Sequence, residues 1–416
     1  MNIVVFGLSI TSSWGNGHAT TWRALLRAMA ARGHSIHFLE RDVPWYAPHR
    51  DLAEPGFCRL TLYRDRDELD AYLPQVRAAD AVLIGSYVPE GVEIARWVQR
   101  HARGTIAFYD IDTPVTLAKL AAGDHEYVDR DVIAGLDLYL SFTGGPTLRR
   151  LERDHGAPAA AALYCSVDAD RYRPTGAAKR WDLSYLGTYS PDRQPTLERL
   201  LIEPARRAPH RRFVVAGPQY PDTIDWPANV ERIEHCPPDA HADFYSASRF
   251  TLNVTRADMR AAGWSPSVRL FEAGACGAAI LSDRWDGIED VLVPPREIGL
   301  VDDTEAVLAA LENDALAAAM GEAGRRAVLA RHTAGHRAAE LERLLLDHAA
   351  PTATRAAPLA PMAAVRCSCS AGGRRRRSRP GSRGQSPGSA TSTSATTTLR
   401  CGRCCRLPPS SAGGGA

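Results

Sequence analysis

The segment SPSVRLFEAGACGAAILSD, residues 265–283, contains the strongest structural signal in the chain. Ser267 stands where a helix cap stands, an apolar-periodic run follows it, and Gly277 ends that run before a second apolar stretch begins. We therefore expect a helix over 267–276 and a buried strand over 278–281. The small residues near the end of the helix would let it pack closely beside a strand or a ligand.

Two charged side chains of this segment point to a binding site. Arg269 and Glu272 are three residues apart and therefore lie on one face of the expected helix. A guanidinium group can bind a diphosphate, and a carboxylate can accept two hydroxyls of a ribose. The same spacing also suits a surface ion pair, so the sequence leaves both interpretations open.

Outward from this segment, strand and helix signals alternate along the first 350 residues. In the first half, the expected strands are 2–8, 35–39, 81–84, 105–109 and 138–142, and the expected first helix is 19–32. In the second half, the strands are 183–186, 213–216, 250–254 and 278–281, and the helices are 194–207, 239–247, 267–276, 303–313, 314–330 and 334–348. Such alternation predicts two α/β domains with parallel sheets.

The predicted domain organisation has four parts. Residues 1–167 form the first domain, 168–333 the second, and 334–350 a helix that packs back on the body. Two parallel-sheet domains that face each other place a ligand cleft at the carboxyl ends of their strands. Residues 351–416 form a disordered basic tail, because their composition cannot bury enough apolar surface to offset the entropy of ordering.

The net charge of +2 conceals two regions of opposite sign. Residues 1–350 carry 39 basic and 48 acidic residues, whereas the tail carries eleven Arg and no acid. Only two of the basic residues are Lys, so the many arginines reflect composition and do not indicate a nucleic-acid partner. No apolar run is long enough to span a membrane, and the N-terminus reads as a strand. We expect a cytoplasmic protein.

The tail admits further interpretations. Its run Arg374–Arg377 is typical of an arm for nucleic acid or for acidic membranes, so a peripheral membrane contact stays open. Cys401 and Cys404 have the spacing of a zinc ligand pair, but the tail contains no His. The interpretation that we favour is a disordered extension, for which out-of-frame translation of GC-rich DNA is one origin.

A glycine-containing loop follows the first expected strand. Gly15, Asn16 and Gly17 precede His18 where the first helix begins, a place suited to phosphate or other anions. The loop is neither a dinucleotide-binding fingerprint nor a Walker loop. His18 can act as a general base, or it can simply cap the helix.

Two carboxylates, Asp110 and Asp112, come directly after the expected strand 105–109. At the carboxyl end of a strand they can hold Mg²⁺ or act as a base. A solvated turn or a cap for the helix that Thr113-Pro114 opens is the structural alternative.

Together these segments resemble the two-domain GT-B glycosyltransferases. Residues 268–273 with Gly277, and the later stretch 283–289, are similar to the spore-maturation (CgeB-like) family, and the loop before His18 resembles the acceptor loop of the peptidoglycan N-acetylglucosaminyltransferase family. The interdomain stretch 164–168 with Tyr172 also fits this fold.

The resemblance implies a transferase that uses a nucleotide-sugar donor in polysaccharide biosynthesis, with no metal or other cofactor. Its acceptor would be a glycan, a lipid-linked molecule or a small molecule. The residues that it implies for donor binding are Gly187, Arg193, Arg256, Arg269 and Glu272. It implies His18 as catalytic base, with Asp110 or Asp112 as the alternative, and Gly15, Asn16 and Gly17 on the acceptor side.

One departure from the resemblance matters. Many retaining enzymes of this fold carry a Glu-x7-Glu pair, but Trp264 stands where the first Glu would be. The retaining outcome therefore does not follow. A nucleotide-sugar epimerase on the same fold and a noncatalytic nucleotide-sugar-binding protein are the alternatives.

Overall fold

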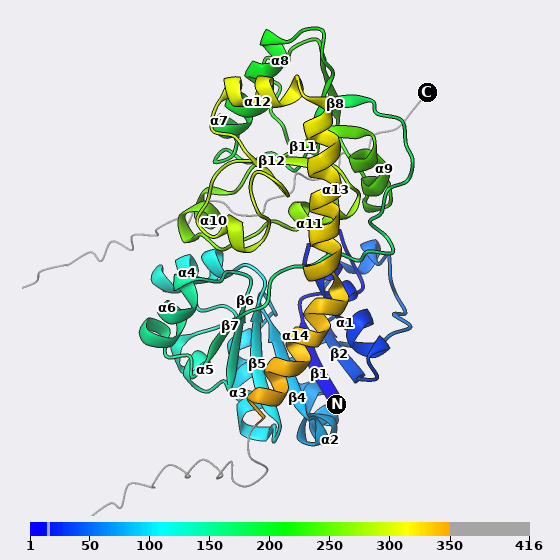
Figure 1. Ribbon diagram of the computed structural model, residues 1–416. Helices are drawn as coiled ribbons and strands as arrows, with labels where there is room; N and C mark the ends of the chain where they lie inside the picture. The colour runs from blue at the N-terminus through cyan, green and yellow to red at the C-terminus, as the bar shows by residue number, and fades with distance from the viewer. Residues whose placement is uncertain (15–16, 350–416) are drawn as a thin grey trace, which may run out of the picture. The chain divides into compact units, whose positions relative to one another are not determined.

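The computed structural model describes residues 1–14 and 17–349, all within one compact unit (Figure 1). Gly15, Asn16 and residues 350–416, which include the predicted tail, lie outside the described residues. The described chain contains two separate parallel sheets with helices around them, which confirms the expected α/β fold class.

The first sheet has seven strands and lies in the first half of the chain. Its strands are β1 (Asn2–Gly7), β2 (Ser35–Arg41), β3 (Arg59–Tyr63), β4 (Ala81–Gly85), β5 (Thr105–Asp110), β6 (Leu138–Ser141) and β7 (Ala160–Ala162). The helices between them are α1 (Gly17–Ala31), α2 (Leu73–Ala78), α3 (Gly91–His101), α4 (Thr113–Ala121), α5 (Arg130–Ala134) and α6 (Pro146–His155).

The second sheet has six strands. They are β8 (Trp181–Leu186), β9 (Phe213–Ala216), β10 (Val230–Ile233), β11 (Ser248–Asn253), β12 (Ala279–Ser282) and β13 (Gly299–Leu300). Its helices are α7 (Gln194–Leu197), α8 (Glu203–Arg207), α9 (His241–Ser246), α10 (Ala257–Ala262), α11 (Val268–Ala275), α12 (Thr304–Leu311), α13 (Asp314–Arg331) and α14 (Ala334–Asp347). A π turn, η3 (Glu198–Ile202), joins α7 to α8, so the helix expected over 194–207 is continuous.

Both sheets are wound in the same way. The strand orders are β3-β2-β1-β4-β5-β6-β7 and β10-β9-β8-β11-β12-β13, and every strand pair is parallel. The winding reverses between β1 and β4 in the first sheet and between β8 and β11 in the second. Ligands of such sheets bind outside the carboxyl ends of the strands at this reversal. The fold therefore directs attention to the loops that follow these four strands.

The chain crosses between the two domains twice, and the two crossings touch. Val167 and Thr333 form an isolated parallel bridge, with Val167 N donating to His332 O at 3.1 Å and Ala334 N donating to Val167 O at 2.9 Å. The sequence analysis ends the first domain at residue 167 and the second at residue 333, and these boundaries stay a prediction. Beyond the bridge, α14 packs against α1 of the first domain. Arg32 on α1 and Glu342 on α14 form an ion pair there.

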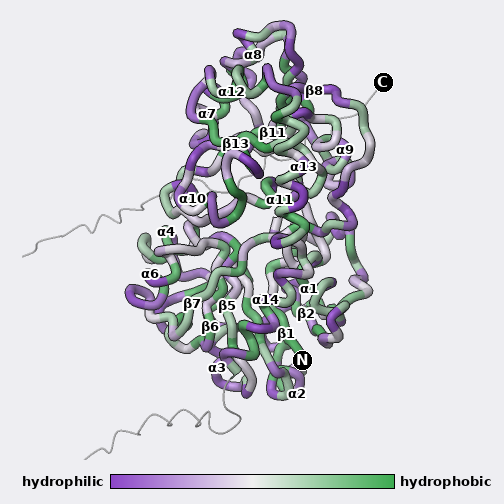
Figure 2. Tube along the Cα trace, viewed as in Figure 1, coloured by the Kyte–Doolittle hydropathy of each residue, from purple (hydrophilic) through white to green (hydrophobic). Residues whose placement is uncertain are grey.

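Apolar residues fill both faces of the sheets, and Figure 2 shows hydrophobic residues along the strands of the first sheet. Four strands were not predicted: β3, β7, β10 and β13. All four lie at the edges of the sheets, where β3 and β10 have mixed exposure, β7 has three half-buried alanines and β13 has only two residues, so none of them shows a long, strongly apolar run. None of the helices in the described residues is both long and apolar enough to cross a membrane.

Candidate active site

The donor-side arginines lie together at the carboxyl edge of the second sheet. Gly187 follows β8, Arg193 precedes α7, Arg256 follows β11, and Arg269 lies in the first turn of α11. Burial lowers the pKa of Arg193, and the charges of Arg269 and Arg256 lower it further. Ala257 N donates to Asp192 Oδ2 at 2.8 Å, and this hydrogen bond joins the segments that carry Arg256 and Arg193. Such a cluster favours an anion such as a diphosphate.

Arg269 forms most of its hydrogen bonds with other residues of the chain. Its Nε and Nη2 both donate to Leu186 O, at 2.8 and 2.6 Å, and its Nη1 donates to Asn253 Oδ1 at 3.0 Å. The guanidinium carbon also lies 5.0 Å from the centroid of the Tyr185 ring. Arg269 therefore ties the carboxyl ends of β8 and β11 together and contributes its charge from behind them.

Arg193 and Arg256 have more capacity for a ligand. Arg193 donates from Nη2 to Thr188 O at 2.6 Å, but its buried Nε has no hydrogen-bond partner in the described part of the chain. Arg256 is exposed at the end of β11. These two side chains are the better candidates for direct contact with an anion.

Gly187 is required by close packing of two loops. A Cβ built on Gly187 would lie 2.8 Å from Tyr185 Oη and 2.9 Å from Arg269 Nη2. A Cβ on Gly217, which has a φ of +140°, would lie 2.2 Å from the Gly187 carbonyl oxygen. The two glycines thus let the loops after β8 and β9 touch.

Glu272 lies on the buried face of α11, beside the linker between the domains. Burial raises its pKa to about 7, and a hydrogen bond with Tyr172 and the charge of Arg269 oppose that rise. His241 Nδ1 lies 3.9 Å from Glu272 Oε2 and 3.3 Å from Tyr172 Oη. The carboxylate is reached through a 130 Å³ cavity between the domains, which Tyr172 also lines. This carboxylate can accept hydroxyl groups of a ligand that enters the cavity.

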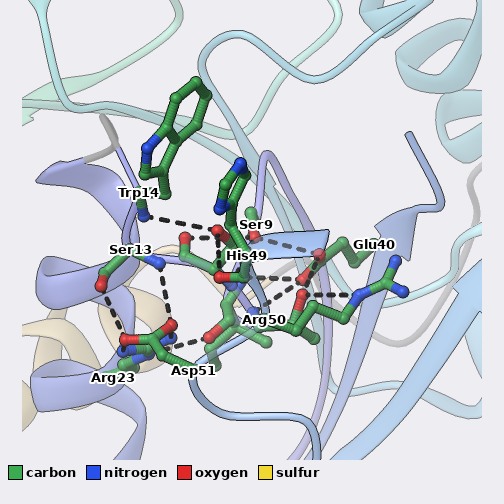
Figure 3. A network of polar contacts seen from close by, with 11 residues as sticks. Ser9, Ser13, Trp14, Arg23, Glu40, His49, Arg50 and Asp51 are labelled. Carbon is green, nitrogen blue, oxygen red and sulfur yellow. Dashed lines mark hydrogen bonds and ion pairs between the residues drawn. The ribbon is translucent and has the colours of Figure 1, made fainter. Parts of the chain in front are cut away.

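The loop after β1 is shaped by a buried carboxylate that the sequence analysis did not single out. Glu40, at the end of β2, is fully buried and accepts hydrogen bonds from Ser9 Oγ (3.0 Å), Ile10 N (2.7 Å), Thr11 N (3.0 Å) and Thr11 Oγ1 (2.6 Å) (Figure 3). The only feature of the sequence that could have indicated this role of Glu40 is its position as an acidic residue at the carboxyl end of an apolar strand.

The same loop is held from its other side by an ion pair. Arg23 of α1 binds Asp51 with two contacts of 2.9 and 2.7 Å, and Ser13 donates to Asp51 from both its N and its Oγ (Figure 3). The bond to Arg23 is the main cause that holds the pKa of Asp51 well below its usual range. Trp14 stacks on His49 with 4.4 Å between ring centroids. The residues up to Trp14 therefore have a defined conformation, and Gly17 begins α1.

His18 lies at the start of α1, half-buried against Tyr87. The two ring centroids are 5.3 Å apart, and the rings meet edge to face. Burial lowers the pKa of His18 to about 4, so the imidazole is neutral at neutral pH. Tyr87 Oη in turn donates to Asp112 Oδ2 at 3.3 Å. The structure thus connects two predicted catalytic residues through Tyr87, which the sequence analysis missed.

Tyr87 has an unusual backbone conformation. It follows β4 at the reversal of the first sheet and has a φ of +62°, in the left-handed region that is uncommon for a bulky residue. Such strain is concentrated at functional sites in proteins. Its position after a predicted strand was visible in the sequence, but the conformation that turns its ring toward His18 was not.

Asp110 and Asp112 occupy different environments. Asp110 is fully buried and accepts hydrogen bonds from Tyr139 Oη (2.6 Å), Thr116 Oγ1 (2.8 Å) and Asp112 N (3.2 Å), and burial raises its pKa to about 6. Asp112 is half-buried; burial raises its pKa, and the charge of Arg256 opposes the rise. The geometry therefore favours Asp112 for contact with a ligand and gives Asp110 a supporting position beneath the loop.

Trp264 lies where the two domains meet. Gly144 N donates to Trp264 O at 2.8 Å, and Trp264 Nε1 donates to Asp290 Oδ2 at 2.6 Å. Trp264 has a φ of +42°, and a Cβ on either Gly145 or Gly287 would lie 2.4 Å from its ring. The side chain that replaces the expected Glu is thus packed between glycines of both domains. Within the described residues, no group of three or more His, Cys, Asp or Glu side chains is placed to hold a metal ion.

Comparison with known proteins gives two results. Residues 193–343 match the sequence profile of a family described as glycosyl transferase-like. This match includes Arg193, Arg256, Arg269 and Glu272, and it ends within α14. None of the curated protein sequences matches the chain.

Solved structures of several proteins share the fold. Sucrose-phosphate synthase from Thermosynechococcus elongatus has a TM-score of 0.59 at 15% identity, with 83% of this chain and 98% of that chain covered. Anabaena HepE in complex with UDP and glucose has a TM-score of 0.61 at 11% identity, with 83% and 100% covered. An alpha-glucosyltransferase in complex with UDP-glucose and DNA has a TM-score of 0.60 at 13% identity, with 83% and 99% covered.

Proposed function

We propose that this chain, which has the two-domain GT-B glycosyltransferase fold and a glycosyl transferase-like second domain, moves a sugar from a nucleotide-activated donor to an acceptor. Two of the similar structures hold UDP or UDP-glucose, so a UDP-sugar is the first donor to test. The reaction that we propose needs no metal ion. We also propose the closer relationship to the CgeB-like family, which rests on the sequence of residues 268–273 with Gly277.

The observation that carries this proposal is the arginine cluster beside Glu272. A diphosphate placed after β8 and β11 would meet Arg193 and Arg256, while Arg269 adds charge from behind. Glu272, reached through the cavity, would accept hydroxyls of the ribose. Positive charge at this place stabilises the nucleoside diphosphate as it leaves, which is the main electrostatic demand of glycosyl transfer.

The acceptor side is the row formed by His18, Tyr87 and Asp112. In the step that we propose, an acceptor oxygen forms a bond to the anomeric carbon, and the bond from that carbon to the diphosphate breaks. The electron pair leaves with the nucleoside diphosphate, and the acceptor proton passes to Asp112 or His18. Asp112 is the first choice, because burial keeps its pKa above that of an ordinary Asp and it lies near Arg256.

The test is a calorimetric titration of the full chain with UDP, UDP-glucose and the other common nucleoside diphosphates, with and without EDTA. We expect one nucleotide to bind best, EDTA to have no effect, and Glu272→Gln to weaken binding about tenfold. A folded protein that binds none of these ligands would overturn the proposal. Release of a modified nucleotide sugar without any acceptor would instead indicate an epimerase, and binding without any turnover a noncatalytic protein.

A further inference from the structure

A groove of 610 Å³ runs between α4 and α6 of the first domain and α10 of the second. α10 packs on α4, so the groove lies where the two domains meet (Figure 1). Its volume is within the range of about 300–1,000 Å³ that is typical of small-molecule sites. The donor-side cluster and the cavity at Glu272 are lined by other residues, and the proposed function does not yet use this groove.

The walls of the groove are apolar on one side. Every α4 residue that lines it is apolar, with Leu117, Ala118 and Ala121 along the helix. α10 adds two alanines. Few side chains on these walls can form hydrogen bonds, and a sugar would leave most of its hydroxyls without partners there. The groove therefore suits a ligand with an apolar body.

The opposite wall is positively charged. Arg149, Arg150 and Arg153 of α6 all line the groove. Arg153 pairs with Asp154 at 2.6 Å, whereas Arg149 and Arg150 are exposed and form no hydrogen bond or ion pair with another described residue. The first turns of α4 and α6 also lie on the groove and present the positive ends of their helix dipoles. Against these stands one acidic lining residue, Asp258.

One end of the groove adjoins the proposed reaction site. α4 begins directly after Asp112, and α10 begins directly after Arg256. The charges of Arg256 and Asp258 both act on the Asp112 carboxylate, so these three residues are close together. A ligand in the groove would therefore lie close to the Asp112 carboxylate.

We propose that this groove binds the acceptor of the glycosyl transfer, and that the acceptor is an anionic amphiphile: a single apolar chain that carries a phosphate group, with the hydroxyl that attacks the sugar at the end near Asp112. The chain lies along α4 and the phosphate meets the arginines of α6. This inference rests on the proposed function, because it assigns the second substrate of the same site. The groove lies between helices of both domains. Its walls can therefore enclose a single ligand molecule, whereas a flat membrane surface would not enter it.

The experiment is a calorimetric titration of the full chain with dodecyl phosphate below its micelle concentration. We expect saturable binding of one molecule per chain, and at least about tenfold weaker binding to Arg149→Glu/Arg150→Glu. Ala118→Trp, at an exposed position of α4 that tolerates a larger side chain, fills the groove and abolishes binding. Arg77→Glu, at an exposed arginine of α2, is the matched control and leaves binding unchanged.

Three comparison ligands (dodecyl maltoside, inorganic phosphate and anionic vesicles) and the donor UDP-glucose make each outcome decisive. Dodecyl maltoside binding as tightly as dodecyl phosphate overturns the role of the arginines, and inorganic phosphate binding as tightly overturns the role of the apolar wall. Binding to anionic vesicles but not to the monomer overturns the single-molecule site. If the unmodified chain and every variant bind UDP-glucose but none of them binds dodecyl phosphate, the groove is not an acceptor site, and the proposed function is unaffected. If the chain binds dodecyl phosphate but no nucleotide, the groove is a binding site but not the acceptor site of a glycosyl transfer.

Discussion

Glu40 and Glu272 are both buried glutamates at the ligand-facing side of a parallel-sheet domain, yet their surroundings differ. Glu40 accepts four hydrogen bonds from a single loop of the first domain. Glu272 has Tyr172 as a partner and opens onto a cavity, and burial raises its pKa to about 7. A carboxylate whose oxygens are all bonded supports a loop, whereas one that is desolvated but incompletely bonded is available to a ligand.

The pair Asp110 and Asp112 repeats this difference two residues apart. The fully buried Asp110 accepts three hydrogen bonds, and Asp112 is half-buried with Tyr87 and Arg256 nearby. We therefore expect Glu40 and Asp110 to affect stability, and Glu272 and Asp112 to affect binding and turnover. Four measurements can break or sharpen this division.

The largest effect should follow from Asp112→Asn. If Asp112 takes the acceptor proton, this change lowers kcat by about 10²–10⁴-fold and leaves donor affinity nearly unchanged. UDP release from UDP-glucose, with water or an added acceptor, is the measurement. Asp110→Asn is the matched control. We expect it to lower the melting temperature and to change kcat much less than Asp112→Asn does. Full activity in Asp112→Asn together with loss in His18→Ala would transfer the role of base to His18.

The next effect is on stability. Glu40→Ala removes the acceptor of four hydrogen bonds and leaves buried backbone N–H groups of the first loop without partners. We expect the free energy of unfolding to fall by about 3 kcal/mol or more, measured by urea denaturation. Glu93→Ala, at an exposed position of α3, should change it by less than about 0.5 kcal/mol. Equal effects of the two substitutions would contradict the supporting role of Glu40.

A smaller effect is expected from Arg256→Ala. Loss of a charged hydrogen bond to the diphosphate should weaken UDP-glucose binding by about ten- to hundredfold, measured by calorimetry. Arg284→Ala is a suitable control, since this exposed arginine of the same domain pairs with Asp302 away from the cluster. If Arg193→Ala weakens binding and Arg256→Ala does not, the diphosphate lies nearer α7 than β11.

The smallest effect is a pH dependence. Burial raises the folded-state pKa of Glu272 to about 7, so the carboxylate that we propose accepts ribose hydroxyls is largely protonated at pH 6 and ionised at pH 8. Affinity for UDP-glucose should therefore rise with pH, by up to about tenfold between these values. UDP-glucose is the appropriate ligand, because its diphosphate diester keeps a constant charge in this range. Glu272→Gln should show a flat profile, and a flat profile in the unmodified chain would remove Glu272 from the donor site.

Local signals in the sequence were sufficient to predict most of the helices and strands of the second domain and the central strands of the first. The helix α11 and the strand β12, which follows Gly277, lie within one residue of their expected ranges, because the cap, the apolar period and the glycine stop agree there. The continuous helix over 194–207 was equally visible despite its π turn. The edge strand β3 was not, because its residues are half-exposed and carry no clear period.

For the site, sequence position identified which loops matter, but not what each side chain does. Arg193, Arg256 and Arg269 were all expected to bind the donor, and the structure brings them together. It also turns Arg269 onto Leu186 O and Asn253, which no local pattern indicates. Tyr87 and Glu40 were missed because their partners lie in loops and a helix that are distant from them in the sequence.

What the sequence by itself determined is the alternation of strands and helices, and with it two parallel sheets whose loops carry Gly187, His18 and the acidic and basic candidates. Hydrophobic period and helix capping act over a few residues, so they can be read along the chain. Only the tertiary structure decided which carboxylates are saturated, which arginines are free to meet a ligand, and that Trp264 is wedged between glycines of both domains. Burial and hydrogen bonding between distant segments set those properties, and neither has a local signature.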